Sequence, residues 1–197
     1  YGRAYNPKIK KGEFTSILTS RGCPYKCKFC SRNAISLGLY RSRSTNNILK
    51  ELKKIHLEGF RYLSFMDDSF LSNKKQAFDI FNYILKEKMD LKIYITASRA
   101  DSADKKLYEL MKKAGVVSLQ FGIESGNQEV LDFYNKKTTL EKIRYAVELS
   151  NECGFFTSGT IILGAPFETK ENFKRTIEFA KSLPIDAVSF LPLRYMA

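Results

Sequence analysis

Three cysteines stand close together near the start of the chain, as Cys23, Cys27 and Cys30 in the pattern Cys-x3-Cys-x2-Cys. Closely spaced thiolates on one loop can hold a metal centre, and soft sulfur selects zinc, copper or an iron–sulfur cluster. A structural zinc site needs four protein ligands, but Cys153 lies far along the chain and His56, the single histidine, falls within a helical pattern. Three thiolates holding a 4Fe-4S cluster leave one iron open to a bound ligand. Structural thiols or a degenerate zinc knuckle are the alternative.

Positive charge is concentrated around these cysteines. Residues 1–50 hold eleven Lys and Arg against a single acid, Glu13, whereas the rest of the chain is nearly neutral within the total of +12. Such a surplus indicates an anionic partner bound nearby. Three kinds of partner fit: an anionic cofactor, an acidic substrate or a nucleic acid. The cations nearest the cysteines would offset the negative charge of a cluster; they are Arg21, Lys26, Lys28 and Arg32.

The elements that position these cysteines are predicted to be strands alternating with helices. Short runs rich in Val, Ile, Phe and Tyr predict six strands, and apolar residues spaced three and four apart predict five helices between them. The predicted strands are 14–19, 62–66, 92–97, 117–122, 157–163 and 187–191. The helical patterns lie at about 48–55, 77–85, 107–114, 143–150 and 173–180.

This regular alternation predicts an α/β fold with a parallel sheet of right-handed units. A closed eight-stranded barrel takes about 250 residues, so six units in 197 residues favour a partial (β/α)6 barrel. An open doubly wound sheet is the alternative. Both architectures bind ligands at the C-terminal ends of the strands. The connection after the first strand, from about residue 20 to 45, is long enough to be functional, and it carries the three cysteines.

Helix ends are marked by glycines and polar caps. Gly59, Gly115 and Gly154 follow helical patterns and predict C-terminal caps in the left-handed conformation. Asn73, and Thr138 with its partner at position 141, predict N-terminal caps.

The cysteine spacing, with the aromatic Phe29 directly before the third cysteine, resembles the signature of the radical SAM superfamily. The resemblance implies that Cys23, Cys27 and Cys30 ligate three irons of a 4Fe-4S cluster, while the amino and carboxylate groups of S-adenosylmethionine (SAM) chelate the fourth. In that family one electron cleaves the sulfonium and yields a 5′-deoxyadenosyl radical. The resemblance also implies Phe29 beside the cofactor and an electron donor such as ferredoxin or flavodoxin.

Two carboxylates, Asp67 and Asp68, follow the second predicted strand in the form Phe-x-Asp-Asp-x-Phe. Carboxylates at a strand end can accept hydrogen bonds from an ammonium group, and the resemblance assigns this place to the methionine amine of SAM. The form is similar to that of the subgroup that often carries a cobalamin-binding domain. The alternative is that one aspartate caps the next helix and the other is solvated.

Charged side chains also follow the third and fourth strands. Arg99 lies in Ser-Arg-x-Asp, where it could pair with the methionine carboxylate or with Asp101. Glu124 lies in Gly-Ile-Glu-Ser-Gly, where the family has a polar group for the ribose or the methionine end. Lys136 is predicted to end the next helix, where related proteins have a basic residue for the SAM carboxylate.

The last two strands carry the residues that the resemblance assigns to adenine. Ile162 and Gly164 match the segment that holds the base by backbone and apolar contact, although Phe167 replaces the usual glycine after the proline. Leu191 would complete the adenine wall, or else is ordinary core.

The resemblance covers about residues 14–191 and predicts that residues 1–197 form one radical SAM core domain. Because the chain opens on Tyr1 and has no apolar targeting stretch, we expect a cytoplasmic fragment of a longer protein whose N-terminal domain is missing and binds cobalamin. The expected function is reductive cleavage of SAM, followed by cobalamin-dependent methyl transfer or rearrangement of a small-molecule substrate. The alternative is a metal- or cluster-stabilised nucleic-acid-binding or RNA-modifying module using the basic N-terminal quarter.

Overall fold

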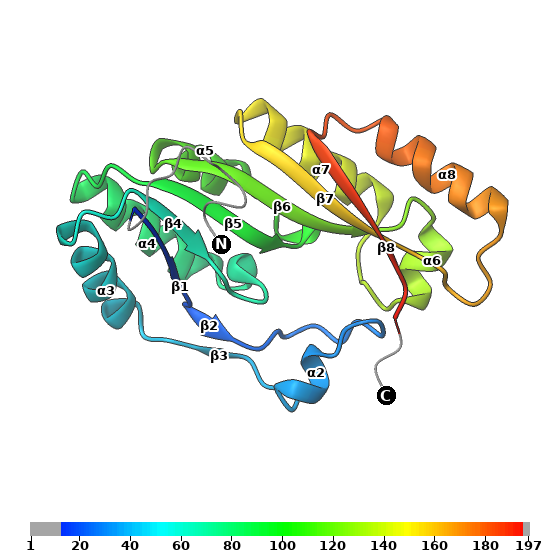
Figure 1. Cartoon of the computed structure of the whole chain (residues 1–197), viewed down its shortest axis with the longest axis horizontal. Helices are drawn as coiled ribbons and strands as arrows, with labels where there is room; N and C mark the ends of the chain where they lie inside the picture. The colour runs from blue at the N-terminus through cyan, green and yellow to red at the C-terminus, as the bar shows by residue number, and fades with distance from the viewer. Residues whose placement is uncertain (1–12, 195–197) are drawn as a thin grey trace.

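Six parallel strands form one curved sheet in the computed structural model, which describes residues 13–194 (Figure 1). They are β1 (Phe14–Ile17), β4 (Tyr62–Phe65), β5 (Lys92–Ser98), β6 (Val116–Glu124), β7 (Phe156–Leu163) and β8 (Ala187–Pro192). Each strand pairs with its neighbour in that order and every pairing is parallel. Because β1 and β8 are the two edges and do not pair, the sheet is an incomplete barrel. The predicted partial (β/α)6 barrel is confirmed.

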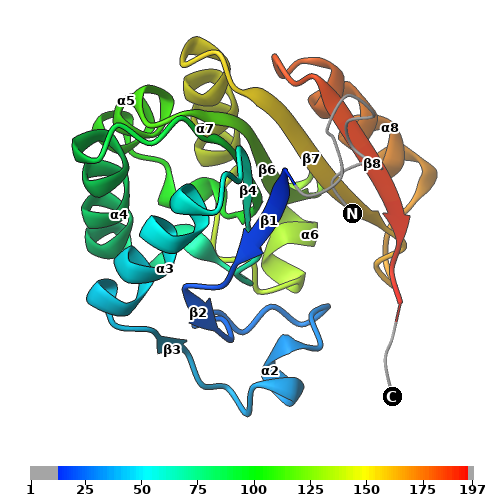
Figure 2. The ribbon, with the colours of Figure 1, turned by 60° about the vertical axis from the view of Figure 1, so that its left-hand side comes forward.

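Five longer helices cover the convex face of this sheet (Figures 1 and 2). They are α3 (Thr45–Leu57), α4 (Lys74–Lys86), α5 (Lys105–Lys113), α7 (Leu140–Glu152) and α8 (Lys170–Lys181). Four of them turn an apolar stripe toward the sheet, as α3 does with Ile48, Leu52 and Ile55, all buried. In α8 the buried residues are Asn172, Thr176 and Ala180. The shared core between sheet and helices includes three packed rings, Phe65, Phe70 and Phe81.

Side-chain caps begin each of these helices. Asn73 accepts a hydrogen bond from the Gln76 backbone, which confirms the cap predicted for α4. The cap predicted at Thr138 is wrong, because Thr139 accepts the bond from the Lys142 backbone instead. Two adjacent threonines offer the same capping chemistry, so only the path of the chain into α7 decides between them.

The three predicted C-terminal glycines all have positive φ, with 85° at Gly59, 95° at Gly115 and 69° at Gly154. A Cβ at Gly115 would lie 2.0 Å from the backbone oxygen of Leu91, whereas one at Gly59 would meet nothing within 4 Å. The two positions therefore share the same conformational constraint and differ in the space around them.

We expect Gly59→Ala to lower the free energy of unfolding by about 1 kcal/mol, because alanine is strained in the left-handed region. Gly115→Ala adds overpacking against the backbone and should cost about 3 kcal/mol. Urea unfolding of both variants measures the difference. Equal losses would contradict the close approach of Leu91.

The sequence patterns do not predict the shortest helices and strands. The antiparallel pair β2 (Ser20–Arg21) and β3 (Arg41–Ser42) closes the connection after β1, and α2 (Arg32–Ile35) lies within it. The helix α6 (Gln128–Phe133) follows β6, and the 3-10 turns η1 (Phe70–Ser72) and η2 (Ala100–Ser102) follow β4 and β5. Each is too short to show a periodic signal. Among residues 13–194, no helix is long and apolar enough to cross a membrane.

Candidate functional site

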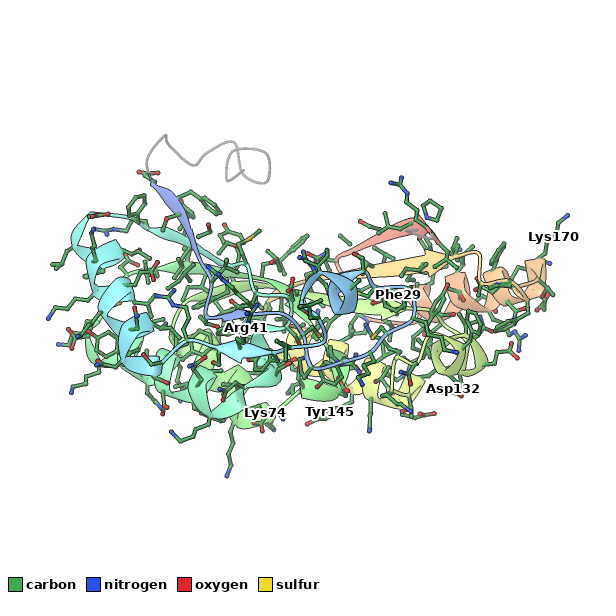
Figure 3. All side chains as sticks on the ribbon, turned by 90° about the horizontal axis from the view of Figure 1, so that it is seen from below. Phe29, Arg41, Lys74, Asp132, Tyr145 and Lys170 are labelled. Atoms are coloured by element: carbon green, nitrogen blue, oxygen red, sulfur yellow. The ribbon has the colours of Figure 1, made fainter. Side chains whose placement is uncertain are left out.

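The cysteine loop, residues 22–40, runs past the C-terminal ends of the strands (Figure 1). Figure 3 views the molecule from this side, with Phe29 and Arg41 labelled. The Lys28 backbone donates a hydrogen bond to the Tyr134 carbonyl at 2.9 Å, and Asn135 donates from its side-chain amide to the Lys26 carbonyl at 2.8 Å. The ring of Phe29 meets Tyr134 edge to face. These contacts fix the loop against the segment that follows α6.

Cys23, Cys27 and Cys30 are partly buried free thiols on this loop. Burial raises the pKa of the Cys23 and Cys27 thiols above the ordinary value, and the positive charge of Arg99 acts in the opposite direction on both. The pKa of Cys23 also responds to Cys27 and Cys30, so the three thiols lie within electrostatic reach of one another. Burial outweighs this positive charge, so both thiols hold their protons more tightly than a free thiol, and metal binding must release those protons.

The donor set fits a cluster better than a single ion. Among the residues that the structure describes, no three His, Cys, Asp or Glu side chains are arranged to hold one metal ion. A zinc ion requires its sulfur ligands to converge at about 2.3 Å from one point. A 4Fe-4S cluster instead presents separate irons to separate thiolates. The three soft donors of the loop, with no fourth Cys or His in residues 22–40, can supply three ligands to such a cluster.

Asp67 anchors the start of the cysteine loop. Its carboxylate is 2% exposed. It accepts hydrogen bonds from the Thr19 backbone at 3.1 Å, the Thr19 hydroxyl at 2.7 Å and the Ser20 hydroxyl at 2.5 Å. Sequence reasoning missed this role, because Thr19 and Ser20 carry no motif.

Asp68 points to another partner and forms an ion pair from Oδ1 to Arg32 Nε at 2.9 Å. Asn73 caps α4 and Ser69 precedes η1, so neither aspartate caps the next helix. The alternative of a capping aspartate beside a solvated one is therefore wrong.

Arg99 pairs with Asp101, the second of the two partners left open by the sequence. Its Nε and Nη2 donate to the two carboxylate oxygens at 2.9 and 2.8 Å. Nη2 also donates to the Lys136 carbonyl, and Nη1 lies 3.6 Å from the sulfur of Cys27. The guanidinium lies 3.7 Å from the ring centroid of Tyr25. One buried side chain thus joins the end of β5 to the cysteine loop.

Glu124 and Lys136 form a buried ion pair, with Nζ 2.6 Å from Oε1 and both side chains at most 7% exposed. Gly122 makes room for the pair, because a Cβ there would lie 2.3 Å from the carboxylate and 2.8 Å from the amine. The Lys136 amine also lies 5.6 Å from the ring centroid of Phe29. The prediction that Lys136 ends the helix is wrong, since α6 stops at Phe133 and Lys136 belongs to the loop beyond it.

An apolar cluster brings the cysteine loop next to the end of β7. Val130, Tyr134 and Ala165 form its buried part, and Phe29 and Ile162 pack against it. Gly164 follows with φ of 107°, and its backbone donates to the Glu168 carboxylate at 2.7 Å. Leu191 is 48% exposed on β8, so the reading of this residue as ordinary core is wrong.

The comparisons with known proteins decide the family. The family model described as Radical SAM superfamily matches residues 17–180. The chain belongs to the radical SAM superfamily. Membership in this enzyme superfamily implies a 4Fe-4S cluster and SAM as cofactors.

Curated relatives of this radical SAM domain are longer proteins. It is 36% identical over 178 residues to an uncharacterized methyltransferase of Pyrococcus horikoshii, covering 90% of this chain and 39% of the relative. It is 30% identical over 165 residues to the anaerobic magnesium-protoporphyrin IX monomethyl ester cyclase of Cereibacter sphaeroides, covering 82% of this chain and 27% of the relative. The chain therefore spans less than half the length of both relatives.

Solved structures share the fold of the radical SAM domain. The methyltransferase TsrM from Kitasatospora setae, with cobalamin and a [4Fe-4S] cluster bound, superposes with a TM-score of 0.85 at 21% identity, covering 92% of this chain and 37% of that one. The cobalamin-dependent radical SAM enzyme OxsB superposes with a TM-score of 0.74 at 25% identity, covering 87% and 27%.

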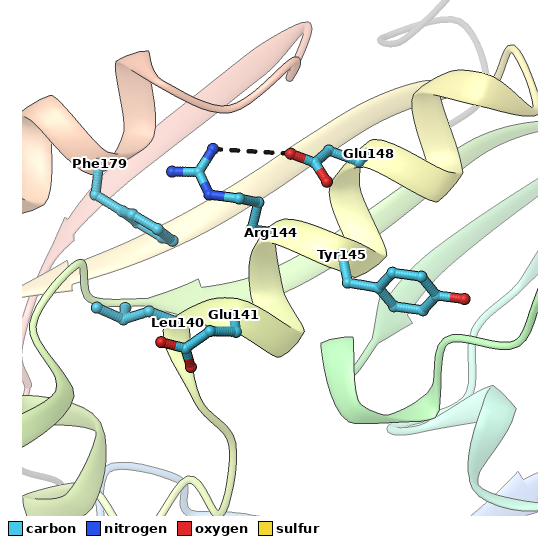
Figure 4. A pocket seen from close by; sticks show the side chains of 6 residues that line it. All are labelled: Leu140, Glu141, Arg144, Tyr145, Glu148 and Phe179. Carbon is cyan, nitrogen blue, oxygen red and sulfur yellow. Dashed lines mark ion pairs between the residues drawn. The ribbon is translucent and has the colours of Figure 1, made fainter.

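A separate hollow of the radical SAM domain lies between α7 and α8 (Figure 4). Its central side chain, Arg144, is already bound to Ser182 and faces Glu148 at 3.9 Å and the ring of Phe179. None of the predicted site residues lines this hollow. The structure brings together the cysteine loop, Arg99, Glu124, Lys136 and Ile162. Leu191 is paired with Ile162 across β7 and β8, although it lies outside the buried apolar cluster.

Proposed function

We propose that this chain is the catalytic domain of a radical SAM enzyme that reductively cleaves SAM to a 5′-deoxyadenosyl radical. One observation carries the proposal: three free thiols on a loop at the strand ends have basic side chains within electrostatic reach, and residues 22–40 contain no fourth Cys or His. When bound, the cluster would supply the electron for that cleavage.

Under this proposal Cys23, Cys27 and Cys30 ligate three irons. Phe29 and Ile162 would contribute an apolar wall to the cofactor site, since both pack against the cluster around Tyr134. Gly164 would let the backbone approach the adenine, because it lacks a side chain and has positive φ. Leu191 would add to that wall from β8, where its exposed side chain has room for contact.

The polar residues would have two roles at the methionine end of SAM: one would bind it directly, and the others would hold the site in shape. Asp68 is the proposed acceptor for the amine, because the ion pair with Arg32 engages one of its two oxygens. Asp67 would support it indirectly by holding the loop. Glu124, Lys136 and Arg99 are paired with protein groups and would shape the site rather than supply free charges.

We further propose cobalamin-dependent methyl transfer or rearrangement as the reaction of the whole protein, with the cobalamin-binding domain upstream of this one. OxsB, which is cobalamin-dependent by its description, and the relative named as a methyltransferase support this. A ferredoxin or flavodoxin is the proposed electron donor, and the substrate is a small molecule.

Anaerobic reconstitution of the protein with iron and sulfide tests the proposal. With SAM and a strong reductant, the loaded protein should form 5′-deoxyadenosine and methionine. An aerobically prepared, iron-free sample is the control. Iron loading without any SAM cleavage would contradict the proposed function.

Nucleic-acid binding by the basic quarter should be weak. Several of its cations already have partners on the same chain: Arg32 pairs with Asp68, Arg43 pairs with Glu51, and Lys28 lies over the ring of Phe133. Lys8, Lys10 and Lys11 lie outside the described residues. We expect polyanion binding in filter assays to fall steeply with salt, because each neutralised phosphate releases counterions. Tight, sequence-selective binding at physiological salt would instead support an RNA-modifying enzyme.

A further inference from the structure

Arg99 combines deep burial with an unusual set of acceptors. Its side chain is 7% exposed, and its four hydrogen bonds reach the two oxygens of Asp101, the carbonyl of Lys136 and the sulfur of Cys27. Cys27 is a proposed iron ligand, whereas Arg99 has no free edge left for the carboxylate of SAM. The contact with sulfur therefore requires an explanation of its own.

The orientation of the guanidinium is fixed by the protein. Asp101 binds one edge of the planar group through two nearly equal bonds, which is the strongest geometry available to an arginine. Tyr25 covers one face, with its ring centroid 3.7 Å from the guanidinium carbon. Rotation would break both contacts, so Nη1 stays directed at the Cys27 sulfur. This donor is in place without any contribution from a metal.

We propose that Arg99 tunes the cluster, because its Nη1 donates to the Cys27 thiolate and makes the cluster easier to reduce. The inference rests on the proposed function, in which Cys27 ligates iron. Reduction adds one electron, and part of the added negative charge falls on the ligating sulfurs. A hydrogen-bond donor with positive charge stabilises that reduced state more than the oxidised state, and hydrogen bonds to sulfur are known to set cluster potentials.

Asp101 determines the sign of the effect that each substitution has on the reduction potential. Arg99 and Asp101 together are nearly neutral, so the pair acts on Cys27 as a dipole whose positive end lies nearer the sulfur. Removing the guanidinium leaves the negative end alone, which disfavours the extra electron. Removing the charge of Asp101 leaves the positive end alone, which favours it. The two substitutions should therefore shift the reduction potential in opposite directions.

Redox titration of the anaerobically reconstituted protein, followed by electron paramagnetic resonance, measures this directly. In Arg99→Gln we expect the equilibrium constant for reduction to fall about tenfold, equivalent to about 59 mV for one electron. In Arg99→Lys we expect a smaller fall in this equilibrium constant, because lysine keeps the positive charge but lacks the planar set of N–H donors of the guanidinium. Asp101→Asn should shift the potential to higher values.

Arg144→Gln is the matched control. Arg144 is also an arginine beside an aromatic ring and a carboxylate, but it lies in the hollow between α7 and α8 (Figure 4). Its substitution should leave the potential unchanged.

If Arg99 only supported the fold, its variants would change the iron content, but the reduction potential would not shift in opposite directions in the Arg99 and Asp101 variants. Loaded clusters with wild-type potentials in both Arg99 variants, or a downward shift in Asp101→Asn, would overturn the inference. If Arg99→Gln does not load iron, the sign of the shifts in Arg99→Lys and Asp101→Asn decides it. Failure of the wild-type protein to load a cluster would contradict the proposed function itself, and the tuning with it.

Discussion

Alanine at Cys23, Cys27 or Cys30 is expected to abolish cluster loading and SAM cleavage. Each variant removes one of the three proposed ligands, and residues 22–40 contain no fourth cysteine. Losing a group that only hydrogen-bonds to a metal ligand already costs about 10–100-fold in metal affinity, so losing a ligand itself should reduce loading by more than about hundredfold. Iron and sulfide content, visible absorption and 5′-deoxyadenosine formation measure the effect.

Cys153→Ala is the matched control, because it removes the same group elsewhere. Cys153 directly follows the last residue of α7 as its C-terminal cap and is partly exposed. Burial, followed by the charges of Glu109 and Glu152, raises its pKa and keeps it unreactive. This variant should load iron and cleave SAM as the wild type does. Retained iron in Cys27→Ala would contradict the ligand assignment.

Lys136→Met should produce the largest loss of stability. It leaves the Glu124 carboxylate buried without its partner, and breaking a buried ion pair from one side costs about 3–5 kcal/mol. The free energy of unfolding from urea titration measures this cost. The cysteine loop should loosen as well, since the Lys136 amine that lies over the ring of Phe29 is lost.

A double variant separates the ion pair from the packing around it. Glu124→Gln with Lys136→Met removes both charges, so it should recover much of the stability that the single Lys136 change loses. Lys54→Met is the control for losing a lysine, because Lys54 pairs with Glu58 on the exposed side of α3 and should cost less than about 0.5 kcal/mol. Additive losses in the double variant would show that the two side chains do not interact.

Local sequence patterns predict the main strands and helices, because each pattern depends only on residues that are close together in the chain. The six strands and five long helices follow from apolar spacing, and the glycine caps follow from the need for positive φ. The elements that the patterns miss, such as β2, β3 and α6, have two to six residues each. Such lengths are too short for a period to appear, and long-range contacts hold them in place.

The sequence alone determined the chemistry of the cysteine loop, because the spacing of three thiols is a local property of the chain. It also placed charged residues at the ends of neighbouring strands. Only the tertiary structure decided their partners: Asp67 with Thr19, Arg99 with Asp101 and Cys27, and Glu124 with Lys136. A buried charge binds whichever opposite or hydrogen-bonding group the fold brings within about 3 Å. That choice depends on strand register and on the path of the loops, which no local pattern records.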